Sequence, residues 1–94
     1  MNLKELHTTD SPLQTTKIFT PTEGVNAINM GSGTQLKEHQ SKVAALLVCV
    51  TGEIVYEKEG GAKEKLLPGD FVKIMPEARH GLMAETDSTA LLIK

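Results

Sequence analysis

The chain has 94 residues and a mass of 10.2 kDa, which is enough for a single domain with one hydrophobic core. Its formal charge is −2, and its ten basic residues are scattered among twelve acidic ones, which argues against nucleic-acid binding. No apolar run approaches the roughly 20 residues of a membrane-spanning helix, and the N-terminus lacks the apolar core of a signal peptide. We therefore expect a cytoplasmic protein that binds neither nucleic acid nor membrane.

The first residues are polar and end at a proline. Pro12 has a fixed φ and no backbone N–H, so a helix does not continue through it. Leu3 and Leu6 are spaced for one short turn. We expect an N-terminal extension over residues 1–13 and one domain over residues 14–94.

From Gln14 onward the chain consists of short segments separated by glycine, proline or aspartate, a spacing typical of β-sandwiches and barrels. No segment shows a sustained helical period with caps, which argues against an α/β fold. The sequence therefore predicts an all-β domain. Its expected strands are 14–20, 24–30, 34–39, 44–50, 53–58, 62–67, 70–75, 80–85 and 88–93.

The glycines at the breaks between segments can adopt a positive φ at little cost. The relevant pairs are Thr51-Gly52, Gly60-Gly61 and Pro68-Gly69. The first two predict hairpins, of 44–50 with 53–58 and of 53–58 with 62–67. The third pair matches the central residues of a type II turn.

Val43–Val50 is an apolar run without the alternation that a strand with one wet face shows. Both faces of this strand are therefore expected to be buried. We expect a second subunit to cover the outer face, which predicts a homodimer with two-fold symmetry; the alternative is a cover by the N-terminal segment. Cys49 lies inside the run and is interpreted as a buried, inert thiol rather than a nucleophile.

Three histidines occur, and their neighbours distinguish them. His7 lies in the polar extension and is expected on the surface. His39 lies near the end of one predicted strand and His80 at the start of another. Side chains at such strand–loop junctions can converge on the mouth of a barrel.

The spacing of these residues resembles the two motifs of the cupin superfamily. Gly33 through His39 to Gly52 reproduces the outer frame of the first motif, and Gly69 through His80 keeps the length of the second. The resemblance covers roughly residues 17 to 93, and it implies a double-stranded β-helix, or jelly-roll barrel. Leu36-Lys37-Glu38-His39 and the Gly-Asp turn are similar to one subgroup of very small cupins, often without an assigned reaction.

The resemblance also implies where a metal site would be. The family's set of three histidines and one carboxylate maps its first and last histidines to His39 and His80, but Ser41 and Ala45 stand at the other two positions. Two neutral imidazoles without a carboxylate bind divalent ions weakly. We expect either no cofactor or a weakly held Zn²⁺, Fe²⁺, Mn²⁺ or Ni²⁺. The candidate substitute ligands are Glu77, Ser41 and Gln35.

The expected ligand pocket lies inside the barrel. Its predicted lining consists of His39, His80, Ser41, Gln35, Arg79, Met30, Leu47, Met75 and Leu82. A mostly apolar cavity with two imidazoles suits a small ligand with one polar or anionic end. Arg79, the only arginine, can hold a carboxylate through two hydrogen bonds. The leading hypothesis is a small-molecule binding or sensing module.

Three alternatives stay open. A metal-dependent dioxygenase, isomerase or lyase would use His39, His80 and a substitute ligand. Metal-free acid–base chemistry would use one histidine as the base, but the motifs place no tyrosine beside it, because Tyr56 belongs to a different strand. A structural role in a complex is the third. Whether the protein is an enzyme is not decided by its sequence.

Overall fold

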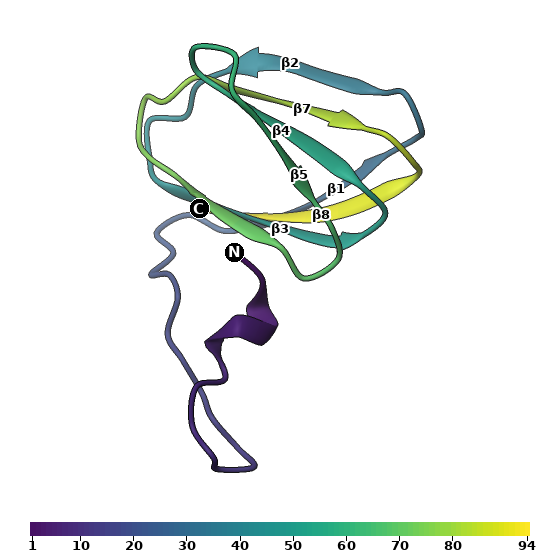
Figure 1. The fold of residues 1–94 in the computed structure, drawn as a ribbon. Helices are drawn as coiled ribbons and strands as arrows, with labels where there is room; N and C mark the ends of the chain where they lie inside the picture. The colour runs from purple at the N-terminus through teal and green to yellow at the C-terminus, as the bar shows by residue number, and fades with distance from the viewer.

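Two facing antiparallel sheets form the body of the molecule (Figure 1). The computed structural model describes the backbone of residues 1–94 and the side chains of all of them except Glu38 and His39. The strands are β1 (Val25–Met30), β2 (Gln35–His39), β3 (Ala45–Thr51), β4 (Ile54–Lys58), β5 (Lys63–Leu66), β6 (Phe71–Ile74), β7 (His80–Ala84) and β8 (Ser88–Ile93). In this described backbone, one sheet has the order β1-β8-β3-β6 and the other the order β2-β7-β4-β5.

The predicted all-β architecture is confirmed, with the strands from β1 onward close to their expected positions. The strand expected over 14–20 is wrong, because the described backbone forms no ladder there. Ile18 and Phe19 instead pack against the outside of the first sheet. β-branched and aromatic residues favour strands because they pack on pleated surfaces, and this segment packs without a pairing partner. The expected short turn is the 3-10 helix η1 (Leu3–Leu6).

One of the two predicted hairpins forms. β4 pairs with β5, as expected, but the hairpin predicted between β3 and β4 is wrong. β3 lies between β8 and β6, so it has no free edge to offer β4. The chain crosses at Gly52 from one sheet to the other, where β4 pairs with β7.

Gly52 is required by close packing at this crossing. Its φ is +82°, and a methyl group on its Cα would lie 2.8 Å from the Cα of Ser88 and would collide with the carbonyl of Asp87. The backbone N–H of Glu53 donates to the Ser88 hydroxyl at 3.1 Å. The turn between β7 and β8 therefore closes directly over the crossing.

β3 is buried on both faces, as predicted. Ala45, Leu47 and Cys49 belong to the core between the sheets, whereas Leu46 and Val48 belong to a second cluster outside them. The side chains that cover this outer cluster include Leu6, Ile18 and Phe19. The N-terminal segment thus provides the cover, so the burial of β3 does not itself require a second subunit.

The predicted type II turn is present at Leu67–Asp70. The Asp70 N–H donates to the Leu67 carbonyl at 2.8 Å, and Gly69 has a φ of +90°. The Asp70 carboxylate also accepts from the Leu67 N–H at 2.8 Å. This bond is the largest cause of the lowered pKa of Asp70, followed by the bond from the Asn2 amide.

The start of the chain is attached to this turn and to β6. The Phe71 N–H donates to the Met1 carbonyl at 2.7 Å, and the Leu3 N–H donates to the Gly69 carbonyl at 2.8 Å. The Asn2 amide donates to the Asp70 carboxylate at 2.9 Å. These bonds fix η1 beside the edge of the first sheet.

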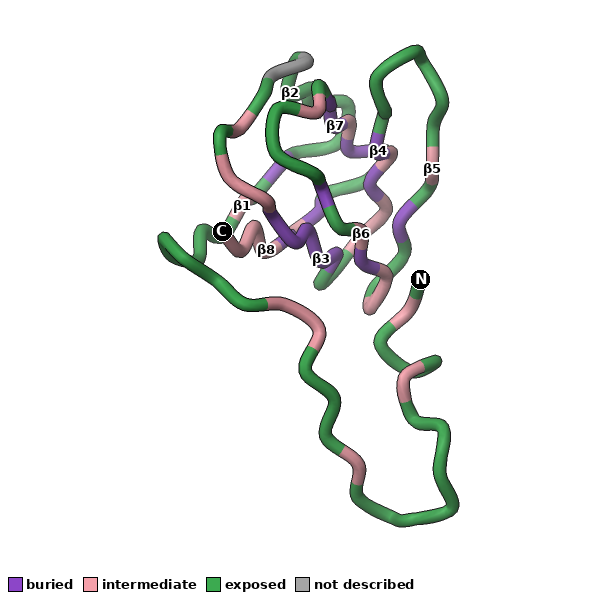
Figure 2. Tube along the Cα trace, turned by 90° about the vertical axis from the view of Figure 1, so that its left-hand side faces the viewer, coloured by how far each residue is buried: buried purple, intermediate pink, exposed green. Residues whose placement is uncertain are grey.

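Residues 8–17 form a loop that projects away from the sheets, and Figure 2 shows it as mostly exposed. The Gln14 side chain closes this loop, accepting from the Thr8 N–H at 2.8 Å and donating to the Leu6 carbonyl at 2.9 Å. No helix within the described residues is long and apolar enough to span a bilayer.

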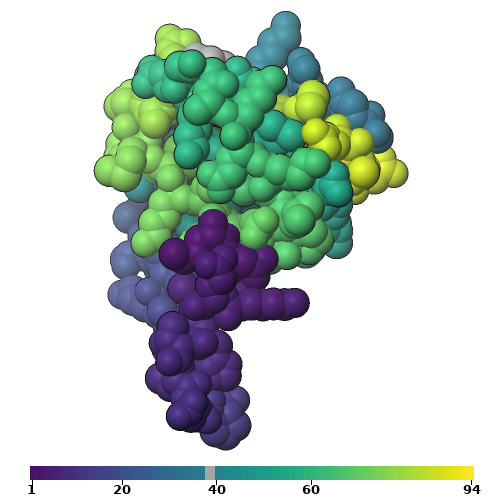
Figure 3. Space-filling view, in the orientation of Figure 1, coloured from purple at the N-terminus to yellow at the C-terminus, as the bar shows by residue number. Residues whose placement is uncertain are grey.

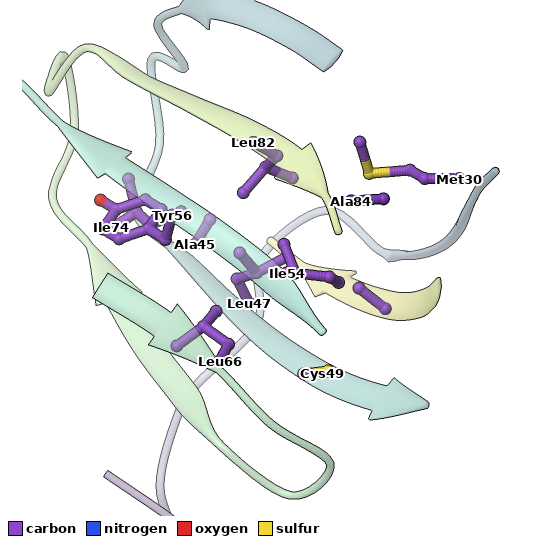
Figure 4. Close-up of a cluster of buried hydrophobic side chains, with 11 residues drawn as sticks. Met30, Ala45, Leu47, Cys49, Ile54, Tyr56, Leu66, Ile74, Leu82 and Ala84 are labelled. Atoms are coloured by element: carbon purple, nitrogen blue, oxygen red, sulfur yellow. The ribbon is translucent and has the colours of Figure 1, made fainter. Parts of the chain in front are cut away.

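The main core runs along the space between the sheets (Figure 4). Tyr56, Ala45 and Ile74 lie at one end of it, and Met30 and Ala84 lie at the other. Cys49 is buried as predicted, and this burial, with a smaller effect of Asp70, raises the pKa of its thiol. A raised pKa disfavours the thiolate, in keeping with an inert side chain.

Replacing Gly52 by alanine tests the crossing. Gly52→Ala is expected to lower the free energy of unfolding by about 3 kcal/mol, because it adds the left-handed penalty to a steric collision. Gly60→Ala is the matched control: φ is +91° there, but nothing lies within 4 Å of the added methyl. Its expected loss is about 1 kcal/mol. Equal losses in urea denaturation would contradict the close packing.

The Asp70 carboxylate makes the stability of the fold depend on pH in the acidic range. Because the pKa of Asp70 is lowered in the folded state, its carboxylate contributes fully to the free energy of unfolding at pH values above the ordinary pKa of an aspartate. This contribution disappears as the pH falls through the folded-state pKa, below about pH 4. Asp70→Asn is therefore expected to lose about 1 kcal/mol at pH 7. The gap between the two proteins should narrow at pH 3 in urea denaturation. A gap that is the same at both pH values would show that the charge is irrelevant.

Candidate functional site

A buried tyrosine and a buried histidine meet at one end of the barrel. Tyr56 on β4 is 5% exposed and His80 on β7 is 3% exposed. Their ring centroids are 6.0 Å apart, with an angle of 39° between the planes. The Nδ1 atom of His80 lies 3.3 Å from the Ala78 carbonyl, which orients the imidazole. The two strands are neighbours in the sheet, so the contact follows from the topology.

A lysine and a glutamate flank this tyrosine. Glu64 on β5 is the register partner of Tyr56, and its carboxylate lies 3.5 Å from the Lys58 ammonium. Burial, and then the charge of Glu64, raise the pKa of the Tyr56 phenol. The phenol is therefore a neutral hydrogen-bond donor at physiological pH.

The backbone brings the two motif histidines together. His39 at the end of β2 is the register partner of His80 at the start of β7, so sequence-distant residues face each other across one strand pair. The side chain of His39 lies outside the described residues. The roles predicted for it in the pocket and in a metal site therefore remain predictions.

Two loops beside this strand pair are tied together. The Glu77 N–H donates to the Ser41 carbonyl at 2.8 Å, and the Gln40 amide donates to the Glu77 carbonyl at 2.7 Å. Glu77 has a φ of 67°, a conformation that favours glycine.

An open groove of about 750 Å³ lies beside this end of the barrel. We call it the lateral groove. Its walls come from the N-terminal segment, β4, β5, β6 and the loop before β7, and Figure 3 shows the N-terminal residues lying against the body. The lining residues are Met1, Leu6, Thr16, Lys17, Ile18, Tyr56, Lys58, Glu59, Glu64, Phe71, Val72, Lys73, Met75, Ala78 and Arg79.

The charge of this lining differs in sign from that of the whole chain. Among the described residues it contains four cationic side chains and two carboxylates, whereas the chain carries a formal charge of −2. The Lys58–Glu64 pair neutralises one charge of each sign. The lining also contains Lys17, Lys73, Arg79 and Glu59, and the rest of it is mostly apolar.

The predicted pocket residues divide between this groove and other places. Arg79 and Met75 line the groove together with Tyr56, whose ring lies near that of His80. Ser41 is half-buried in a neighbouring loop, and its hydroxyl accepts from the Val43 N–H at 3.4 Å.

The other predicted lining residues do not reach the groove. Leu47 and Leu82 are core residues between the sheets. Met30 also belongs to the core, but it lies at the end of the barrel opposite Tyr56 (Figure 4). Gln35 is exposed on the outer face of β2, where its amide lies 3.8 Å from the Met83 sulfur. Strand alternation explains why Gln35 faces outward, because the next residue, Leu36, is the register partner of the buried Leu82.

The described residues do not fit the metal that the fold family implies. No group of three or more histidine, cysteine, aspartate or glutamate side chains among them is arranged to hold an ion. Ala45, at the family's glutamate position, is 1% exposed and packs in the core. The Nδ1 atom of His80 lies 3.3 Å from the Ala78 carbonyl and is engaged there.

The sequence interpretation missed Tyr56, Lys58 and Glu64 as site residues. A usable signal was present, because alternation along β4 places residues 54, 56 and 58 on one face. The strand order was needed to show that this face meets His80, since β4 pairs with β7 and not with β3.

Comparison with known proteins supports the fold. No protein-family model and no curated protein matches the chain. Among solved structures, KdgF from Halomonas sp. is 29% identical, covering 81% of this chain and 73% of that one, with a TM-score of 0.64. An RmlC-like cupin from Shewanella frigidimarina is 21% identical over 73% of this chain and 63% of its own, with a TM-score of 0.66.

A cupin superfamily protein from Desulfitobacterium hafniense aligns over 100% of this chain and 87% of its own, with 17% identity and a TM-score of 0.71. The chain spans 60% of the length of two other matched structures. The two facing antiparallel sheets agree with these matches. The chain therefore has the RmlC-like jelly-roll fold of the cupins.

Proposed function

We propose that the chain is a binding or sensing module that takes a small carboxylate with an apolar body in the lateral groove. The observation that carries this proposal is the lining, which combines apolar side chains with an excess of cationic ones in a chain of net negative charge. The volume of about 750 Å³ falls in the range of small-molecule sites.

The cationic side chains suit a carboxylate head group. Arg79 offers a planar guanidinium that pairs with both carboxylate oxygens, and Lys73 offers a compact ammonium on the edge strand β6. Ile18, Phe71 and Val72 offer apolar surface for the rest of the ligand. A ligand with both parts gains from burial and from charge pairing at once.

The neutral phenol of Tyr56 adds one directed donor on the barrel side of the groove. Its hydroxyl can donate to a ligand carbonyl or hydroxyl, whereas the cations recognise charge. Ser41 and Ala45 stand at two of the four positions where the cupin motifs have metal ligands. This replacement supports binding without catalysis.

A carboxylate probe tests this proposal. Octanoate is expected to bind in the groove, and octanamide, which keeps the chain length without the charge, is expected to bind at least about tenfold more weakly. Titration followed by heteronuclear NMR would give both dissociation constants and the shifted residues.

The variants Arg79→Gln and Lys73→Gln are each expected to weaken octanoate binding by about tenfold. Lys63→Gln is the matched control, because Lys63 is exposed on the outer side of β5 and does not line the groove. Equal affinity for octanamide, or equal effects of all three variants, would overturn the carboxylate assignment.

A metal-dependent enzyme is the second candidate, and the register pairing of His39 with His80 is the observation that favours it. In that case the two histidines and a substitute ligand would hold the ion, and the metal would polarise the substrate. Ser41 and Ala45, which stand at two of the four ligand positions, support the binding module instead.

Calorimetric titration of chelator-treated protein with Zn²⁺ and Mn²⁺ distinguishes the two candidates. The binding module predicts dissociation constants weaker than about 1 µM for both ions, because two imidazoles form an incomplete site. Tighter binding of one ion per chain, abolished in a folded His80→Gln variant, would establish the metal candidate.

A further inference from the structure

The two sheets end in four edge strands within the described backbone, and these edges are protected to different degrees. β2 carries Lys37 and an irregular register, and the four-residue β5 carries Lys63 and Lys65. β6 is paired at its start with the N-terminal residues. Charges, bulges, short length and covering segments are the features by which proteins keep strand edges from pairing with other chains.

β1 has none of these protective features. It has six residues, an unbroken register with β8, and neither charge nor proline in the sequence Val-Asn-Ala-Ile-Asn-Met. Gly24 and Lys94, just before β1 and just after β8, exchange both backbone hydrogen bonds, at 3.0 and 2.8 Å. Because such pairs alternate along an antiparallel ladder, the N–H and C=O groups of Val25, Ala27 and Asn29 point away from the sheet.

The side chains beside this edge are apolar. Val25 is 59% exposed and Ala27 is also exposed, and their register partners on β8 are Ile93 and Leu91. Ile93 and Leu91 belong to the outer cluster that the N-terminal segment covers, but they remain partly exposed. The apolar outer face therefore continues from β3 through β8 to the open edge of β1.

We infer that β1 is the interface with a second copy of this chain. Two β1 strands pair antiparallel about a two-fold axis at Ala27, which joins the β1-β8-β3-β6 sheets of both copies into one continuous sheet. In this register Ala27 lies opposite Ala27 of the other chain, and Val25 lies opposite Asn29 of the other chain. All three residues with outward backbone groups then gain partners, and the apolar strips of the two copies become contiguous.

A second copy fits this edge because β1 is complementary to itself. The partner must be extended, uncharged and apolar on one face, and it must present backbone groups at every second residue. β1 meets each of these conditions. The projecting loop over residues 8–17 is less suited, because threonine, serine, aspartate and proline dominate it and its glutamine closes it internally. The interface lies on a different edge from the lateral groove, so it is independent of the proposed ligand.

Sedimentation equilibrium at about 100 µM protein provides the test. The wild-type chain is expected at twice the chain mass of 10.2 kDa. Ala27→Lys places like charges opposite each other at the axis and is expected to halve the mass while the circular dichroism spectrum stays unchanged. Asn26→Lys is the matched control: it adds the same charge on the same exposed strand, but on the other face, and should remain dimeric.

Cross-linking then tests the register. Opposed residues in a hydrogen-bonded antiparallel pair have Cα atoms about 5.5 Å apart, within disulfide range. Ala27→Cys is therefore expected to form an intermolecular disulfide under mild oxidation, whereas Asn29→Cys is not, and the buried Cys49 is the internal control. A monomeric wild type, a dimer that Ala27→Lys leaves intact, or preferential cross-linking through residue 29 would each overturn the inference.

Discussion

The burial of β3 on both faces is the constraint on which the rest of the structure depends. Its inward side chains form the middle of the core, and its outward ones, Leu46 and Val48, are as fully enclosed as many core residues. Burial of each leucine or valine contributes about 1.5–3 kcal/mol, a large share of the stability of a small domain. β3 also has neighbours on both edges, β8 and β6, so the chain leaves this sheet at Gly52 and continues in the second sheet.

The N-terminal segment links this constraint to the site. Leu6 and Ile18 cover the outer face of β3, and the same two side chains form one wall of the lateral groove. The segment is anchored through Asn2 to the Asp70 turn, which also starts β6 on the opposite wall. Stability and the shape of the groove therefore depend on the same contacts, and a change in the anchor affects both.

The polar end of the barrel differs from the arrangement that the motifs imply. Ala45 contributes to packing where the family has a carboxylate, while the titratable groups gather on β4 and β5 as Tyr56, Lys58 and Glu64. These groups approach His80 from the strand that pairs with β7. The chemistry of this end is accordingly that of a phenol, an imidazole and an ion pair, which recognise polar ligand groups by hydrogen bonding.

Local patterns determined the all-β class, most strand positions, the type II turn and the burial of Cys49, because turn chemistry and apolar runs depend on neighbouring residues in the chain. The predicted positions of His39 near the end of one strand and His80 at the start of another are confirmed. The tertiary structure alone decided that β3 pairs with β8 and β6, that residues 14–20 pack without pairing, and that Tyr56 meets His80. Those outcomes depend on which strand edges and faces are already occupied, a competition among distant segments that no local pattern records.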